Sequence, residues 1–378
     1  MATVRKRLRS GTDGAMKITW VADYFDQNRQ RHLKTFSSQK AANAWLLETL
    51  GEVARGVHTA ERGSITLGQA AQLWLERGRA EGLERGTLVG YETLVRMHVV
   101  PALGNIKLAQ LSAPRLEGWR DRLVAGLSRT RARRVLWVLK TILSEAQRRG
   151  LVAQNVALSV KIDIRKREQK KLEVGHDIPS REAVQQLLAM AGERYPRYRP
   201  LLVTAALTGL RASELRGLSW SAVDFAKRTI TVRQRADAWG TLGLPKSEAG
   251  QRRVPMSPTV INTLREWRLT CPKSELDLVF PNTRGKVAGL ANLTKHFWHP
   301  LQRRLGMVDP AGHPRFDFHA LRHFAASLWI EQGVSPKRLQ AMLGHSSIHM
   351  TFDVYGHLLG DGEDVHAKLA KAELGVVA

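Results

Sequence analysis

The sequence contains a single cysteine, Cys271, among its 378 residues. One cysteine excludes an internal disulfide and a cysteine-based zinc site, and this usage is typical of a reducing cytoplasm. Long apolar runs are absent, and the N-terminal segment MATVRKRLRSGTDG lacks the apolar core of a signal peptide. The chain also lacks a P-loop and a cluster of acidic residues. We therefore expect a soluble, cytoplasmic protein that uses no metal and no cofactor.

Acidic residues are scarce relative to basic ones. Asp and Glu number 34 against 59 Lys and Arg, which leaves a net charge of +25 and a pI near 10.9. Such an excess concentrates polyanions at the protein surface. Nucleic acid is the first candidate partner, and an anionic membrane face is the second. The hydrophobic content of 43% allows true cores, and the length predicts two or three domains.

The first 60 residues predict a small module with three strands and one helix. The strands are expected at Val4–Leu8, Lys17–Val21 and Arg31–Phe36, and the helix from about Gln39 to Arg55 after an N-cap at Ser37 or Ser38. Residues 1–58 hold ten Lys or Arg and five acids. This excess favours DNA as the ligand of the module, and the alternative is a basic domain that contacts protein.

Residues 64–162 have helical periodicity nearly throughout. The approach to the last helix and the helix itself carry many cations and one acid, Glu145. The cations that we predict to contact DNA are Arg129, Arg131, Arg133, Arg134 and Lys140. A solvated helix face normally mixes both signs of charge. This excess of cations therefore indicates binding to a phosphate backbone rather than an ordinary solvated surface.

The pattern of the remaining sequence predicts a linker, a larger domain and a C-terminal tail. Residues 163–178 are basic and lack apolar periodicity, which predicts a linker. Residues 179–360 predict helices around a strand pair at Thr229–Arg233 and Arg252–Met256, and residues 361–378 predict a terminal helix with a narrow apolar stripe. The expected fold is mainly α with small β-sheets (α+β), in several domains.

Six polar residues stand out in the larger domain: Arg211, Lys246, His319, Arg322, His345 and Tyr355. Arg211 follows Thr-Gly-Leu and precedes Ala-Ser-Glu-Leu, and Lys246 lies on the loop between the two expected strands. His319 and Arg322 are three residues apart, so a helix places them on one face. His345 follows Leu-Gly after an expected helix, and Tyr355 comes ten residues later.

In this order and spacing, the six residues resemble the catalytic set of the tyrosine recombinase, or phage integrase, family. The likeness spans roughly residues 175–360, with Glu214 at the acidic position that supports the first arginine. Each residue alone has an ordinary structural explanation, but three sequence boxes followed by a tyrosine make a strong joint signal. The sequence Ser-Glu-Ala-Gly after Lys246 departs from the family's usual Thr-Lys-Ala-Ser. Residues 65–160 resemble the family's core-binding domain and residues 1–58 its arm-binding module.

The resemblance implies a site-specific recombinase that cuts and rejoins DNA through a covalent 3′-phosphotyrosine. Arg211 and Arg322 can each give forked hydrogen bonds to a phosphate. Tyr355 would attack, with His319 as the expected proton acceptor, His345 as a donor to a phosphate oxygen and Lys246 as the acid for the leaving 5′ oxygen. The implied assembly is a homotetramer on double-stranded DNA attachment sites, away from membranes, whose protomers exchange their C-terminal tails. The alternative for the tail is that it packs on its own domain or frays in solution. A directionality factor or a host DNA-bending protein is a further candidate partner.

Two alternatives to an integrase remain open at this point. The first is a DNA-binding protein on the same fold that has no catalytic activity, against which the full set of expected residues argues. The second is a resolvase or transposon recombinase with the same chemistry, which the sequence barely distinguishes from an enzyme that integrates or excises a phage or another mobile element.

Overall fold

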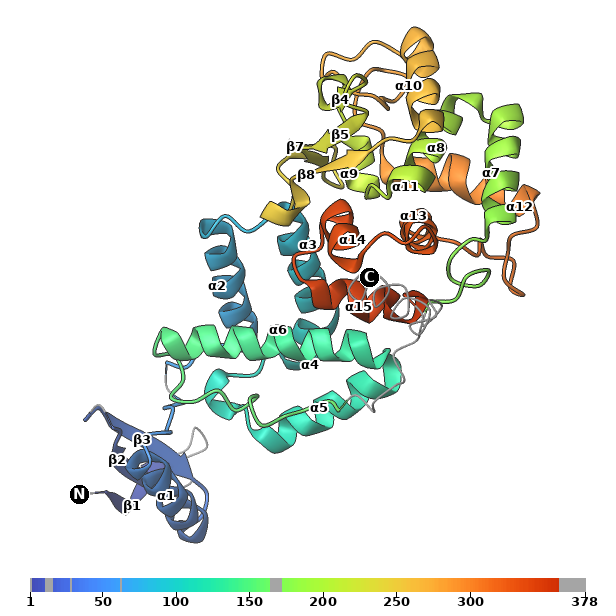
Figure 1. The fold of residues 1–378 in the computed structure, drawn as a ribbon. Helices are drawn as coiled ribbons and strands as arrows, with labels where there is room; N and C mark the ends of the chain where they lie inside the picture. The colour runs from blue at the N-terminus through green and yellow to red at the C-terminus, as the bar shows by residue number, and fades with distance from the viewer. Residues whose placement is uncertain (1, 11–15, 28, 62, 164–171, 360–378) are drawn as a thin grey trace, which may run out of the picture. The chain divides into compact units, whose positions relative to one another are not determined.

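The computed structural model describes the chain except residues 1, 11–15, 28, 62, 164–171 and 360–378 (Figure 1). The chain forms two compact units, residues 1–166 and 167–378. The boundary between them falls within the expected linker. The expected terminal helix at 361–378 lies outside the described residues.

The first unit begins with a three-stranded antiparallel sheet that is covered on one face by a helix (Figure 1). Its elements are β1 (Thr3–Ser10), β2 (Met16–Phe25), β3 (Arg31–Phe36) and α1 (Gln39–Ala54). Ser38 is the N-cap of α1 and accepts a hydrogen bond from the amide of Ala41. Ala22, Tyr24 and Leu46 form the core between sheet and helix. Because side chains alternate along a strand, Arg5, Lys17 and Arg31 lie on the opposite face of the sheet.

The remainder of the first unit is helical. Its α-helices are α2 (Leu67–Ala80), α3 (Arg85–Leu94), α4 (Val100–Leu103), α5 (Ala113–Gly126) and α6 (Arg129–Arg148). Val135, Leu139 and Ile142 on the apolar face of α6 are fully buried and pack in the same core as Trp119 of α5. The longest helix of this unit therefore buries one face and leaves its basic face to solvent.

The second unit is a mostly helical domain with two small sheets (Figure 1). Its α-helices are α7 (Arg181–Arg194), α8 (Arg199–Thr208), α9 (Ala212–Arg216), α10 (Pro258–Thr270), α11 (Leu290–Leu293), α12 (His299–Arg304), α13 (Ala320–Glu331), α14 (Pro336–Leu343) and α15 (Ile348–Tyr355). One sheet has the order β4 (Val223–Asp224), β5 (Thr229–Val232), β8 (Arg252–Pro255), and the other pairs β6 (Arg235–Ala236) with β7 (Leu242–Gly243). The buried helix α8 packs against α7, α10 and α13 and is the centre of the domain.

Two sequence expectations need adjustment here. The expected strand pair is present as β5 and β8, but a second hairpin, β6–β7, is inserted between its strands and was not expected. The expected linker is too long, because Ile178 is fully buried in the core of the second unit. The described end of that segment therefore belongs to the folded domain.

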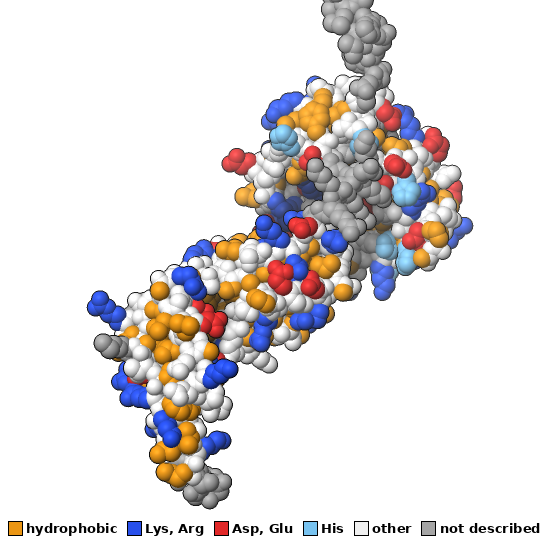
Figure 2. Space-filling view, turned by 90° about the horizontal axis from the view of Figure 1, so that it is seen from below, with side chains coloured by type: hydrophobic (Ala, Val, Ile, Leu, Met, Phe, Trp, Pro, Cys, Tyr) orange, Lys and Arg blue, Asp and Glu red, His pale blue; other side chains and the backbone are white. Residues whose placement is uncertain are grey.

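Basic side chains are widespread on the surface. In the face shown in Figure 2, Lys and Arg side chains are spread over both units, with fewer acidic side chains among them. Over the described part of the chain, no helix combines the length and the apolar character that crossing a membrane requires.

Candidate active site

Arg211 and Glu214 are fixed to each other at the start of α9. Gly209 ends α8 in the left-handed region at φ 58°, and Arg211 is the N-cap of α9. The Glu214 carboxylate accepts hydrogen bonds from the Arg211 backbone amide at 2.8 Å and from Arg211 Nη1 at 2.9 Å. Arg211 Nη2 donates to the carbonyl of Gly344 at 3.1 Å. The acid therefore orients an arginine whose side chain remains one-third exposed.

A second arginine, Arg252, holds Glu214 from the other side. Its Nη1 and Nη2 donate to Glu214 Oε1 and Oε2 at 2.9 and 2.8 Å, and its Nε donates to the Met342 carbonyl at 2.7 Å. Burial raises the pKa of Glu214, but the hydrogen bond and charge of Arg252 outweigh it, so the pKa lies below its usual value. The buried pair thus ties β8 to α9 and to the end of α14.

Arg322 on α13 is only 2% exposed. Its Nη1 donates to the Gly209 carbonyl at 2.8 Å, and its Nη2 donates to the Leu343 carbonyl. These carbonyls lie at the C-terminal ends of α8 and α14, where the helix dipoles favour a cation. Burial and the charge of Arg211 lower the pKa of Arg322 to about 9. Among the described residues no carboxylate forms an ion pair with it, so its charge is available to an anion.

Gly344 allows α14 to approach β8 closely. It ends α14 at φ 67°, in the left-handed region that favours glycine. A Cβ atom at this position would lie 2.7 Å from the Ala249 carbonyl and 2.9 Å from Arg252 Cδ. A larger residue would push His345 and the end of α14 away from Arg211 and Arg252.

His345 and Tyr355 are buried next to this arginine cluster. His345 is 7% exposed, and its Nδ1 lies 3.0 Å from Thr351 Oγ1. Burial and the nearby charge of Arg322 lower the pKa of His345 to about 4. Its ring lies parallel to that of Tyr355, with centroids 6.4 Å apart. Tyr355 ends α15 and is 1% exposed, and burial raises its pKa to about 12 against the opposing charges of Arg322 and Arg211.

The hydroxyl of Tyr355 contacts His323. The distance from Tyr355 Oη to His323 Nδ1 is 2.8 Å. His319, which we expected to accept the tyrosine proton, is the exposed N-cap of α13 and lies edge-on to His323, with ring centroids 5.0 Å apart. Although part of the His319 side chain is exposed, the surrounding protein removes water from the ring, and this desolvation, followed by the charge of Arg322, lowers the pKa of His319. Within the described chain, no hydrogen bond joins His319 to Tyr355.

Lys246 is separate from this cluster in the structure. It is exposed on the segment between β7 and β8, and no hydrogen bond or ion pair links it to another described residue. Five of the six expected catalytic residues, and Glu214, are therefore joined by contacts with one another or with a shared neighbour. The sixth is not.

The cations expected to bind DNA lie on α6, in the first unit. Arg129, Arg133 and Lys140 share one face of the helix, and Arg131 and Arg134 are exposed beside it. Arg129 and Lys140 donate hydrogen bonds to the carbonyls of Asp163 and Leu158, so they also hold the chain that leaves this unit.

Sequence reasoning missed the roles of Arg252 and His323 in this cluster. Both had a local signal. Arg252 and Val254 are two residues apart and share the buried side of β8, and a buried cation requires a partner. His323 comes four residues after His319, so a helix places both rings on one side.

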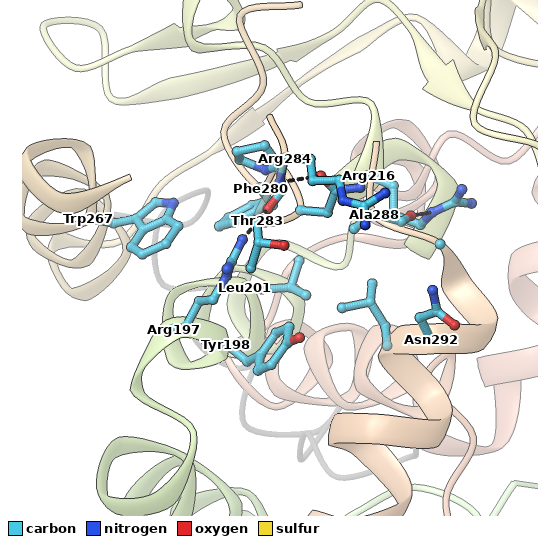
Figure 3. Close-up of a pocket in the computed structure, with 14 residues that line it drawn as sticks. Arg197, Tyr198, Leu201, Arg216, Trp267, Phe280, Thr283, Arg284, Ala288 and Asn292 are labelled. Carbon is cyan, nitrogen blue, oxygen red and sulfur yellow. Dashed lines mark hydrogen bonds between the residues drawn. The ribbon is translucent and has the colours of Figure 1, made fainter. Parts of the chain in front are cut away.

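A cavity of about 450 Å³ in the second unit lies outside the cluster (Figure 3). Leu201, Trp267 and Phe280 are among its apolar lining residues, and Arg197 and Arg216 are turned toward backbone carbonyls, including that of Ala288. None of the expected catalytic residues lines it. Within the described ranges, no group of His, Cys, Asp and Glu side chains is arranged to hold a metal ion.

Comparisons with known proteins match two parts of the chain to one family. Residues 180–360 match the phage integrase family, and residues 66–124 match the N-terminal SAM-like domain of phage integrases. A XerC-like tyrosine recombinase of Caldanaerobacter subterraneus is 27% identical over 88% of this chain and 90% of its own length. An integrase of Streptomyces ambofaciens is 27% identical over 92% of each chain.

Two solved structures have the same fold. The Tn1549 transposon integrase in complex with a circular intermediate DNA has a TM-score of 0.64 and 22% identity over 83% of this chain and all of that one. The lambda integrase tetramer bound to a Holliday junction has a TM-score of 0.60 and 16% identity over 90% of this chain and 95% of that one. The two family matches together span more than half of the chain. The chain therefore belongs to the phage integrase family and is a site-specific tyrosine recombinase, of phage or transposon type, that cleaves and rejoins DNA.

Proposed function

We propose that Tyr355 is the nucleophile and forms a covalent 3′-phosphotyrosine during integration or excision of a mobile element. The observation that carries this proposal is the burial of Tyr355 next to His345 and near two arginines, whose charges oppose the rise in its pKa that burial causes. Arg322 in particular holds a positive charge between two carbonyls. A phosphate anion supplies the charge that this cluster lacks.

Each residue of the cluster has a role in this proposal. Arg211 and Arg322 donate to the non-bridging oxygens of the scissile phosphate as negative charge develops there. If Thr351 donates to Nδ1 of neutral His345, the ring carries its proton on Nε2 and can donate it to a phosphate oxygen. Glu214 and Arg252 hold Arg211 in place. Lys246 protonates the leaving 5′ oxygen after DNA brings its segment to the cluster, a role that rests on the family resemblance.

DNA binding is distributed over both units in this proposal. The sheet face opposite α1 offers Arg5, Lys17 and Arg31, although Arg5 and Arg31 also pair with Asp23. The basic face of α6 follows the phosphate backbone. The lambda integrase tetramer bound to a Holliday junction supports a homotetramer on double-stranded attachment sites. We place this assembly in the cytoplasm, at the nucleoid, with a directionality factor or a host DNA-bending protein as further candidate partners.

Covalent cleavage should proceed in EDTA with no added metal and no nucleotide. The reason is that the proposed cluster supplies positive charge through Arg211 and Arg322, so the phosphate needs no metal ion to offset its charge. The measurement is covalent trapping of a nicked suicide substrate on a denaturing gel, with and without EDTA. A strict requirement for magnesium in the covalent step would contradict the proposed mechanism.

Truncation after Leu359 should preserve binding to a single half-site but weaken synapsis and recombination. The sequence of the tail has Val365, Leu369 and Ala372 on one stripe, and a short helix needs a surface on which to bury it. We propose that this surface belongs to a neighbouring protomer. Gel-shift titration measures half-site binding and synaptic complexes separately. Equal synapsis by the truncated and full-length proteins would show that the tail is not needed in trans.

A further inference from the structure

One contact at the nucleophile has no role in the mechanism proposed above. His323 follows Arg322 on α13, and its Nδ1 lies 2.8 Å from the Tyr355 hydroxyl. The two rings are tilted by 59°, with centroids 5.7 Å apart. Among the described residues, this is the one hydrogen bond of the Tyr355 hydroxyl. The group that meets the reacting oxygen is therefore an imidazole one residue beyond the second arginine.

We propose that His323 is the catalytic base that takes the proton of Tyr355 as it attacks DNA. This inference rests on the proposed nucleophile. In the step, the Tyr355 oxygen forms a bond to the scissile phosphorus while its proton moves to His323 Nδ1. The bond from phosphorus to the 5′ oxygen breaks, and that oxygen takes a proton from Lys246. Rejoining reverses both transfers, so the enzyme returns to its starting protonation state.

The surroundings of His323 keep its ring neutral before the reaction, so that Nδ1 is free to accept a hydrogen bond. Burial and then the nearby His319 hold the pKa of His323 at about 4, so the ring is neutral near pH 7 and its Nδ1 can accept a hydrogen bond. His323 also lines a cavity of about 680 Å³ together with Asp177 and Asp317. The negative charges of these two carboxylates act to raise the pKa of His323 and would stabilise the imidazolium formed in the step.

His319 is less well placed for this role. It is exposed at the start of α13, and its ring meets the ring of His323 rather than the tyrosine hydroxyl. We infer that His319 packs against the base, and that its replacement slows cleavage less than replacement of His323.

The test uses the full chain and a nicked suicide substrate under single-turnover conditions. The variants are His323→Ala and His323→Asn, with His319→Ala for comparison. The Asn amide can still accept a hydrogen bond from Tyr355 but is too weak a base to take its proton. Both His323 variants should bind DNA as the wild type does and cleave at least about 100-fold more slowly, the usual effect of losing a general base. Added imidazole should restore part of the rate of the Ala variant.

A substrate with sulfur in place of the bridging 5′ oxygen separates the base from the acid. Sulfur leaves without a proton, so this substrate should restore Lys246→Ala but not the His323 variants. Cleavage by His323→Asn or His323→Ala at a near wild-type rate would overturn the proposal. Rescue of His323→Ala by the sulfur substrate would also overturn it. Tyr355→Phe is run in parallel. If Tyr355→Phe still traps DNA, Tyr355 is not the nucleophile. If Tyr355→Phe is inactive while His323→Asn is active, only the assignment of His323 as the base is refuted.

Discussion

Replacement of Tyr355 by phenylalanine should abolish covalent trapping of DNA and leave DNA affinity nearly unchanged. The phenol oxygen is the atom that we propose to bond to phosphorus, and phenylalanine keeps the ring that fills the core beside Leu339 and Leu343. Binding depends mainly on phosphate contacts spread over many cations, to which one buried hydroxyl adds little. A denaturing gel of a nicked suicide substrate measures the adduct, and a gel shift measures affinity.

The matched control is Tyr195→Phe in the same unit. The Tyr195 hydroxyl accepts a hydrogen bond from Arg304 at 3.3 Å and has no part in the cluster, so this variant should trap DNA normally. In Tyr355→Phe, the loss of the hydrogen bond to His323 should cost about 1 kcal/mol of stability. Melting curves therefore show whether the variant is folded under the assay conditions. A covalent adduct formed by folded Tyr355→Phe would eliminate this residue as the nucleophile.

Three of the expected catalytic residues lie at points of local structure that the sequence marks. Arg211 follows a glycine that ends α8, and His345 follows a glycine that ends α14. Tyr355 ends a helix capped by Ser347. Glycine and capping residues are local signals, so they are readable without knowledge of the fold. The strands and helix of the first module were predictable for the same reason.

The contacts that connect these points could not be predicted in this way. The pair formed by Arg252 and Glu214 joins residues 38 positions apart, and the pair formed by His323 and Tyr355 joins residues 32 apart. Such contacts depend on how α9, β8, α13 and α15 pack, which periodicity does not specify. The sequence therefore indicated which residue types are present, and the structure determined which histidine meets the tyrosine.

Local backbone irregularities were also beyond the sequence pattern. Two wide helical turns, Val95–Val99 and Thr294–Trp298, each come shortly before a proline, Pro101 and Pro300. A proline has no amide hydrogen and its ring clashes with the carbonyl four residues earlier, so a helix that continues through it must widen or bend. Apolar periodicity places a helix at such a position but does not show that the turn is wide, so the side chains beyond it are rotated from the expected face.

Arg322→Lys and Arg211→Lys should each lose much of the cleavage rate although each keeps its charge. A lysine has one ammonium group and cannot donate as a planar fork. Removal of a donor that stabilises the transition state typically costs about 2–4 kcal/mol, so we expect roughly 30- to 1000-fold slower single-turnover cleavage. The measured quantity is the rate of covalent adduct formation at saturating enzyme, which separates the chemical step from DNA binding.

The two arginine variants should differ in their effect on stability. Arg322 is buried and its two Nη groups donate to carbonyls of Gly209 and Leu343, so a lysine would leave at least one buried carbonyl without its donor. Arg211 is partly exposed and Glu214 keeps its fork from Arg252 when Arg211 is replaced. We therefore expect Arg322→Lys to melt at a lower temperature than Arg211→Lys. The exposed Arg265 of α10 supplies the control, because Arg265→Lys should cleave and melt as the wild type does. If both cluster variants cleave at the wild-type rate, these arginines hold the helices together and do not stabilise the phosphate.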